Sequence, residues 1–267
     1  MSPSRIGAVV LRQAYLMRSS PQRVIPLIGW VAVDMVLWGY ITRYLNSVSH
    51  SGFNFVPALL GAVLLWDFLS RVMQGVTMAF FEDVWSRSFL NFFAGPLTVA
   101  EYLTGLVATG IATSLVGLLV MVTMAGGVFG LSFLGYGLAL VPFLLVLFLS
   151  GIALGIASVA IVLRLGPASE WLIWPIPTLV SPFAGVFYPV SVLPAWMQAV
   201  SRILPPSYVF EGLRTVTAGK PPPWSQLYMG AGLAVLYVIL ACFVFARVHR
   251  YAIRTGLLAR YTAESVS

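Results

Sequence analysis

The chain has 267 residues, of which 60% are hydrophobic and only 9% are charged. Soluble domains carry roughly a quarter charged residues, so this composition excludes a soluble globular fold. The net charge of +7 does not indicate nucleic-acid binding, because the 15 basic residues are scattered along the chain instead of clustering on one polar face. The only cysteine, Cys242, excludes a disulfide framework and a cysteine metal site.

Apolar residues occur in long, continuous runs. No charged residue occurs between positions 102 and 163, and one helical span needs only about 20 apolar residues. A transmembrane β-barrel would instead show short segments of alternating polarity, about 10 residues each. The spans are therefore expected to be α-helices, because a helix satisfies its backbone hydrogen bonds within one segment. The sequence therefore predicts an all-α, polytopic membrane protein with a single membrane domain over residues 1–267.

Residues 1–23 have the pattern of an amphipathic helix. The apolar stripe contains Ile6, Val9, Val10, Leu16 and Met17, with Gln13 among them. Arg5, Arg12 and Arg18 lie outside the stripe. Because such helices are typical of the membrane interface, we expect this segment to lie along the bilayer surface. A frayed polar tail is the alternative interpretation.

The hydropathy pattern predicts six transmembrane helices after this segment. Their ranges are 24–45, 55–79, 102–125, 136–163, 170–190 and 226–247. An even number of spans places both termini on one side. The segments on that side hold ten arginines, the opposite side holds four basic residues, and Arg71 lies inside a span. This excess predicts that both termini are cytoplasmic.

A short amphipathic helix is expected between the second and third spans, at residues 80–93. One face, apolar apart from Ser88, contains Phe81, Val84, Trp85, Ser88, Phe89 and Phe92. Its polar positions are Glu82, Asp83, Ser86, Arg87 and Asn91. Such a helix suits insertion into a groove on a soluble partner, and it equally suits the lipid headgroup region. The residues alone leave both interpretations open.

The segment 191–215, between the last two spans, is long but apolar. Pro194 can open a helix, and Pro205-Pro206 can end it. Between them, Trp196, Met197 and Val200 begin an apolar helical pattern that continues to Leu204. With a second short helix at 207–215, the segment is predicted to form a helical hairpin that re-enters the outer leaflet.

Enzymatic constellations are nearly absent from the sequence. His50 and His249 lie on opposite sides of the predicted membrane, so they cannot share a metal ion or a catalytic relay. There is no glycine-rich loop ending in Gly-Lys-Ser/Thr, and the only lysine is Lys220 on the predicted outer side. We therefore expect no catalytic residue, metal or cofactor in this chain, and any ATP hydrolysis must occur on another polypeptide.

Several short motifs stand in a characteristic order along the chain. They are Phe81-Glu82-Asp83, then Leu90, Gly95-Pro96-Leu97 and Glu101, then Leu193-Pro194-Ala195-Trp196, Pro206-Ser207-Tyr208 and Glu211-Gly212-Leu213-Arg214. With these motifs the full chain resembles the type-2 ABC transporter permease family, whose members export drugs, lipids or lipid-linked glycans. The resemblance departs at residues 86–89, where Ser-Arg-Ser-Phe stands in place of the commoner Gly-Thr-Leu-Glu.

The resemblance implies a half-transporter in the bacterial inner membrane. Two permease copies would pair, and each would dock one of two cytoplasmic ATPase subunits, which bind the ATP and Mg²⁺. The docking element would be the helix at 80–93, so the implied ATPase-coupling residues are Glu82, Asp83, Trp85, Arg87 and Phe89. An amphiphilic substrate would pass outward between the two copies.

Charges inside the predicted spans need a reason, because burying one costs at least about 2.5–3.5 kcal/mol on insertion scales. Asp67 and Arg71 stand four residues apart and can pair on one helix face, and Asp34 can join them. A structural role and a position along the substrate route stay open. The candidate route residues are Asp34, Trp66, Asp67, Arg71, Phe183 and Phe187. The candidate outer gate consists of Trp196, Tyr208, Glu211 and Arg214.

Two other classes of protein compete with this interpretation. A proton-coupled secondary transporter would use Asp34 and Asp67 as proton carriers and would need no docking helix. A membrane-embedded enzyme acting on lipids would need a nucleophile with a base, or a metal site, and the sequence offers neither set.

Overall fold

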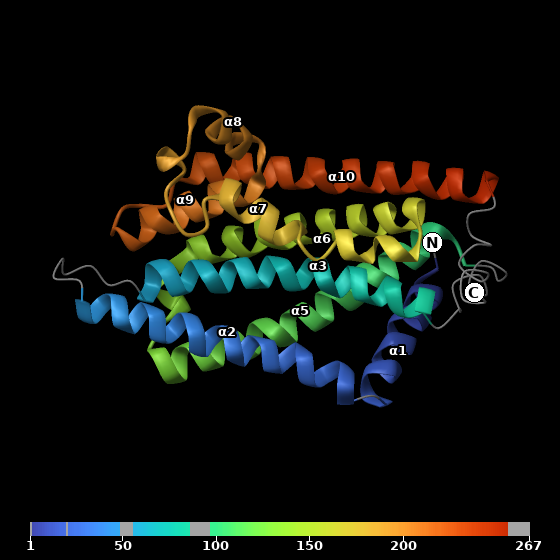
Figure 1. Ribbon diagram of the computed structural model, residues 1–267, viewed down its shortest axis with the longest axis horizontal. Coiled ribbons are helices and arrows are strands. Elements are labelled where there is room, and N and C mark those ends of the chain that lie inside the picture. Colours follow the sequence, from blue (N-terminus) through green and yellow to red (C-terminus); the bar gives the residue numbers. More distant parts are fainter. Residues whose placement is uncertain (1, 20, 49–55, 86–96, 256–267) are drawn as a thin grey trace.

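The computed structural model describes residues 2–19, 21–48, 56–85 and 97–255. Within these ranges, the secondary structure consists of helices and turns without strands, which confirms the all-α prediction. Five long helices follow the long axis of the molecule (Figure 1). They are α2 (Pro21–Val48), α3 (Gly61–Trp85), α5 (Val99–Phe129), α6 (Leu140–Leu165) and α10 (Trp224–Arg254).

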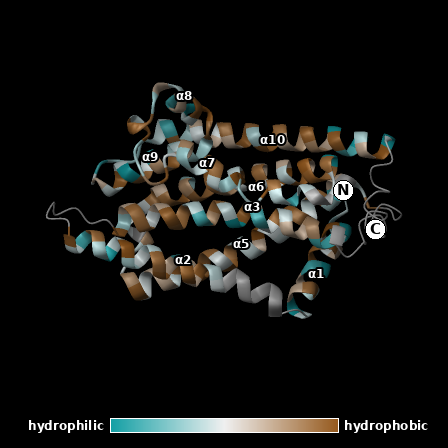
Figure 2. Ribbon diagram, in the orientation of Figure 1, coloured by the Kyte–Doolittle hydropathy of each residue, from teal (hydrophilic) through white to brown (hydrophobic). Residues whose placement is uncertain are grey.

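The long helices pack in a consistent order. Helix α3 lies between α5 and α6, α6 packs in turn against α10, and α2 packs against α5. Hydrophobic residues cover the middle of these helices, while hydrophilic residues gather on α1 and at the end of α10 (Figure 2). Four segments of the described residues are long and apolar enough to cross a membrane. They are Val56–Asp83, Ala100–Phe129, Gly135–Leu165 and Trp224–Arg254.

The N-terminal segment forms helix α1 (Pro3–Ser19), which lies across the end of the bundle where α3 ends and α5 begins (Figure 1). Val9 and Gln13 of the expected apolar stripe are buried, and Val9 packs against Gly105 of α5. Part of the stripe therefore contacts protein. The interfacial position of α1, like the total of six spans, stays a prediction.

Helix α3 is longer than the expected second span. A short π-helix (Val56–Leu60) precedes it, and α3 then continues without interruption to Trp85. No break therefore separates residue 79 from the expected helix at 80–93. The reason is packing, because Phe80, Phe81 and Asp83 are all buried against neighbouring helices. Residues 86–93 lie outside the described ranges.

The expected fifth span, 170–190, is not a single helix. It is divided into a 3-10 helix (Pro167–Leu172), a turn and the short helix α7 (Ile176–Ala184), and a second 3-10 helix follows (Val190–Val192). Pro175 and Pro177 explain the division, because Pro175 directly precedes α7 and Pro177 lies in its first turn. A proline lacks a backbone N–H donor and crowds the preceding turn, so a regular helix cannot continue from residue 170 through this point. Pro182 lies within α7, which ends two residues later.

The expected hairpin consists of two helices, α8 (Ala195–Ile203) and α9 (Pro205–Thr217), with only Leu204 between them. The second helix begins two residues earlier than expected, because Pro205 and Pro206 occupy its first turn, where proline is tolerated. The Ser201 hydroxyl donates to the Phe183 carbonyl at 2.6 Å, and the Ser207 hydroxyl donates to the Ser201 carbonyl at 2.6 Å. These bonds join α7, α8 and α9 into one unit whose depth in a bilayer stays a prediction.

Glycines bring α3 close to both of its neighbours. A Cβ added at Gly75 would lie 2.8 Å from the Gly110 Cα of α5. A Cβ added at Gly155 of α6 would lie 2.8 Å from the Val76 Cβ of α3. Side chains larger than hydrogen cannot fit at such crossings, and close backbone approach is a main source of packing between membrane helices. The core of the bundle is therefore built around α3.

Candidate functional site

The last turn of α3 carries a buried carboxylate. Asp83 is fully buried, and its carboxylate oxygens accept hydrogen bonds from the Arg12 guanidinium of α1 and from the Tyr102 hydroxyl of α5, the latter at 2.7 Å. Tyr102 is also fully buried. The arrangement pairs the Asp83 charge with a cation and a hydroxyl donor, as a buried carboxylate requires. It also ties three helices to one another.

Two further contacts reinforce this junction. The Gln13 side-chain amide of α1 donates to the Ala79 carbonyl of α3 at 3.1 Å. Glu101 lies in the first turn of α5, where its carboxylate accepts from the backbone N–H groups of Ser2 at 2.6 Å and Thr98 at 3.0 Å. The Thr98 hydroxyl accepts from the Glu101 backbone N–H, which completes a capping box. We call the contacts around Asp83, Gln13 and Glu101 the α1 junction.

The α1 junction lies at the ends of α3 and α5 that adjoin residues 86–96 in the sequence, and the expected ATPase-coupling residues are divided between α3 and this segment. Glu82 is half-buried on the last turn of α3, and Asp83 faces α1 and α5 instead of the outside. Trp85 is the last residue of α3. Arg87 and Phe89 lie outside the described residues. Asp83 is therefore placed to hold helices together, which its position in a local polar pattern did not indicate.

A second group of charges lies near the middle of the bundle. The Arg71 guanidinium donates to the Asp67 carboxylate at 2.8 Å, and both side chains are largely buried. The Arg71 side chain lies along α5, where a Cβ added at Gly117 would be 3.0 Å from its Cδ. Asp34 of α2 interacts electrostatically with Arg71 and Asp67. The structure therefore brings Asp34, Asp67 and Arg71 together, as the sequence predicted.

The aromatic candidates for the substrate route separate into different places. Phe187 stacks on Trp38 of α2, with ring centroids 5.3 Å apart. Phe183 instead packs edge-on against Trp196 of α8 at 6.0 Å. Trp66 lies 6.0 Å from Phe210 of α9. Only Phe187 and Trp66 thus connect the long helices with the segments that follow α6.

The candidate outer gate is fastened by its own ion pair. The Arg214 guanidinium donates to Glu211 at 2.9 Å, and the same carboxylate oxygen accepts from the Val190 backbone N–H at 2.7 Å. The Tyr208 hydroxyl donates to the Arg202 carbonyl at 2.7 Å. Trp196 is 64% exposed. Glu211 thus holds α9 against the turn after α7, while Trp196 presents a large apolar surface.

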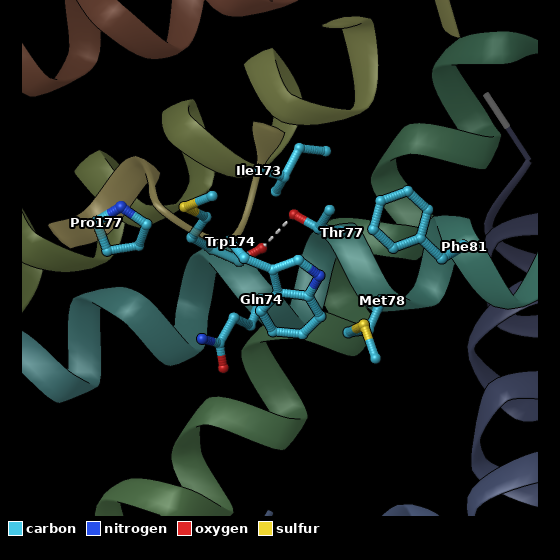
Figure 3. A pocket seen from close by; sticks show the side chains of 8 residues that line it. Gln74, Thr77, Met78, Phe81, Ile173, Trp174 and Pro177 are labelled. Atoms are coloured by element: carbon cyan, nitrogen blue, oxygen red, sulfur yellow. Dashed lines mark hydrogen bonds between the residues drawn. The ribbon is translucent and has the colours of Figure 1, made fainter. Parts of the chain in front are cut away.

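A small pocket, not indicated by the sequence, lies where α3 meets the broken segment before α7 (Figure 3). The α3 side supplies Gln74, Thr77, Met78 and Phe81, with Ile173, Trp174 and Pro177 opposite. The Thr77 hydroxyl donates to the Met73 carbonyl at 2.7 Å, so its proton is already engaged. The wall is mostly apolar and aromatic, and the Gln74 amide is a polar exception.

The amino-acid sequence matches a known family. A family model described as ABC-2 type transporter matches residues 6–217, from within α1 to the end of α9. The chain belongs to the ABC-2 type transporter family. It is therefore a membrane permease component of an ABC transporter, and the resemblance noted in the sequence is confirmed. Among the curated proteins, none matches the chain.

Sequence reasoning about this ABC-2 permease found the ion pairs within one helix but missed the pair from Arg12 to Asp83. The spacing of Asp67 with Arg71 and of Glu211 with Arg214 indicated both ion pairs. The bond from Arg12 to Asp83 crosses 71 positions, and no local pattern indicates it. Among the described residues of the permease, no cluster of three potential metal ligands occurs.

Proposed function

We propose that the permease is the membrane subunit of an exporter in the bacterial inner membrane. Two copies would pair, and each would dock one of two separate cytoplasmic ATPase subunits that bind ATP and Mg²⁺. The substrate would be amphiphilic, such as a lipid-linked glycan, a lipid or a hydrophobic drug. Family membership supports a permease, and the sequence contains no Gly-Lys-Ser/Thr loop for a nucleotide phosphate.

The α1 junction is the observation that carries the coupling proposal. Residues 86–96 connect α3 to α5 in the sequence, and the adjoining ends of both helices carry carboxylates that pair with Arg12 and Arg5 of α1. A push from an ATPase on this segment would therefore act on three helices that are joined by charged hydrogen bonds. Such bonds are roughly twice as strong as neutral ones, so the joined ends should move together.

The middle of the bundle supports an amphiphilic substrate. Asp34, Asp67 and Arg71 give a polar group at mid-length, and Trp38, one turn from Asp34 on α2, adds an aromatic surface by stacking on Phe187. A second copy has a suitable surface on α2, because its outward face is apolar and exposed. That face includes Trp30, Val33, Val36, Leu37, Tyr40 and Tyr44. Both partners of the proposed dimer would line the route.

The docking proposal can be tested at Trp85, the last residue of α3. A central aromatic in an interface commonly contributes about 2 kcal/mol or more, so Trp85→Ala should weaken capture of the ATPase at least about tenfold. The measurement is a pull-down of a candidate ABC ATPase subunit that binds the unaltered permease, with equal membrane insertion verified. Trp224→Ala, at the start of α10, is the matched control and should leave capture unchanged. Equal recovery with Trp85→Ala would reject docking at this segment.

A proton-coupled transporter is the second candidate, because Asp34 and Asp67 lie together in the bundle. The two candidates differ in their energy source. Purified permease in vesicles, supplied with a proton gradient and no ATPase, should accumulate no lipid-linked glycan, phospholipid probe or dye. Accumulation that collapses with the gradient would favour the proton-coupled function. Asp67 already pairs with Arg71, so its use as a proton carrier would require that ion pair to break.

A further inference from the structure

The strongest unassigned feature is a cavity of about 270 Å³ between α6 and α10, which run side by side (Figure 1). The turn between α8 and α9 closes one end, and α7 contributes Val180. We propose that this cavity is a binding site for one acyl chain of a membrane lipid. The proposal does not depend on transport, because it concerns neither the charged group of the bundle nor the residues at the α1 junction.

The cavity exists because small residues face one another across the two helices. Ala153 and Ala157 line it on α6, and Ala241 lines it on α10. The three side chains are single methyl groups, so they leave space that a leucine at the same position would fill. Proteins seldom leave such space empty, since interiors pack as densely as organic crystals. We therefore expect a cavity of this size to hold a ligand.

The walls select an apolar occupant. The only side-chain hydroxyls on the lining belong to Ser150 and Tyr237, and both already donate to backbone carbonyls, at 2.7 Å to Val146 and at 2.8 Å to Ile203. The lining carries no charged residue. A sugar, phosphate or charged headgroup would lose its hydration there without gaining partners, which is unfavourable. A hydrocarbon chain makes no hydrogen bonds with water, so it does not incur this loss when it enters the cavity.

The position and size of the cavity favour an acyl chain over other apolar occupants. Its rim on α10 includes Leu240 and Val244, each 47% exposed and near the middle of a candidate membrane span. The mouth would therefore open into the hydrocarbon layer. At roughly 30 Å³ for a group the size of water, 270 Å³ holds about nine methylenes. One turn of a helix from a second copy occupies roughly 400 Å³ and is too large.

The test uses the full chain in vesicles of phosphatidylethanolamine and phosphatidylglycerol. A trace of phosphatidylcholine carries a diazirine at the middle of one acyl chain, and labelled peptides are identified by mass spectrometry after irradiation. We expect labelling at Leu240 and Val244 to exceed that at the exposed Ala246 at least fivefold. Decanol in excess should remove this labelling, whereas the ring compound anthracene should not.

Two variants that fill the cavity make the test specific. Ala157→Leu and Ala241→Leu, on different helices, should each reduce labelling at Leu240 at least fivefold. Ala246→Leu is the matched control on the outer face of α10 and should leave it unchanged. Labelling at other lipid-facing positions verifies in each variant that the protein is folded. Undiminished labelling in both filled variants, absence of labelling in the wild type, or removal by anthracene alone would each overturn the acyl-chain site.

Discussion

Replacement of Arg12 by alanine is the most direct perturbation of the α1 junction. Arg12 is the cation that pairs with Asp83, and Asp83 is fully buried at the end of α3. Without Arg12, the carboxylate would keep only the Tyr102 hydroxyl as a hydrogen-bond donor among the bonds described above. The docked position of α1 would then bury the Asp83 carboxylate without its Arg12 partner. Undocking of α1 would expose that charge to water and relieve the penalty.

The size of the effect follows from the burial of the pair. Removing one partner from a fully buried ion pair costs about 3–5 kcal/mol. The Arg12 side chain is 27% exposed, so water partly screens the site. We therefore expect a loss of about 2–3 kcal/mol in the free energy that holds α1 docked, which is about a 30- to 150-fold rise in the undocked fraction.

Thiol labelling can measure the undocked fraction. In a Cys242→Ser background, Val9→Cys places the only thiol at a position that is 4% exposed and faces α5. A maleimide reaches it only when α1 opens, so the labelling rate reports the opening equilibrium. Arg12→Ala should raise this rate about 30- to 150-fold. Arg18→Ala, at an exposed arginine of the same helix, is the control and should have little effect.

A double variant decides whether the buried charge is the cause. Asp83→Asn removes the charge and leaves an amide that can still pair with Tyr102. The Arg12→Ala/Asp83→Asn protein should therefore label more slowly than Arg12→Ala alone, although it carries more substitutions. Additive effects of the two substitutions, or an unchanged rate in Arg12→Ala, would refute the reasoning, because additivity means that the two side chains do not interact.

Three other expectations concern packing, topology and the central charges. Gly155→Leu forces a side chain against Val76 of α3, so it should destabilise the bundle by about 1–3 kcal/mol, measured as earlier heat-induced loss of the size-exclusion peak. Gly232→Leu, in open space on α10, is the control and should leave the stability unchanged. Topology reporters fused after Ser88 and after Ser267 should give a cytoplasmic signal, and a reporter within 47–52 should give an external one. A cytoplasmic signal from 47–52 would exclude the six-span topology. The permease with the exchanged pair Asp67→Arg/Arg71→Asp should insert normally, but its complex with the ATPase should lose substrate-stimulated ATP hydrolysis. Full activity of that variant would mean that the pair is purely structural.

Local sequence signals predicted the local structure well. The prolines at 194, 205 and 206 indicated where the helices of the hairpin begin and end, and the structure places α8 and α9 accordingly. The spacing of Asp67 and Arg71 indicated a pair, because residues four apart lie on one helix face. These features depend only on residues within a turn or two of each other.

Two features were not predicted: the contacts of Asp83 with distant segments, and the division of residues 170–190. Helical periodicity placed Asp83 on a polar face together with Glu82, and that face was assigned to an external partner. The structure gives Asp83 partners within the chain, from α1 and α5. Likewise, hydropathy alone predicted one continuous span at 170–190, although its prolines divide the segment. An apolar composition favours burial in a membrane, but it does not determine whether the backbone stays helical.

The ion pairs of the permease differ in range, and the difference indicates how motion could travel. Pairs near the middle of α3 and on α9 join residues three or four positions apart, so the paired side chains come from one helix. The pairs from α1 to Asp83 and Glu101 join separate helices, and both lie beside residues 86–96. Further along the two helices from residues 86–96, Gly75 of α3 and Gly110 of α5 allow the two backbones to lie in close contact. A displacement applied at 86–96 should therefore pass along α3 and α5 as one rigid pair, with α1 following.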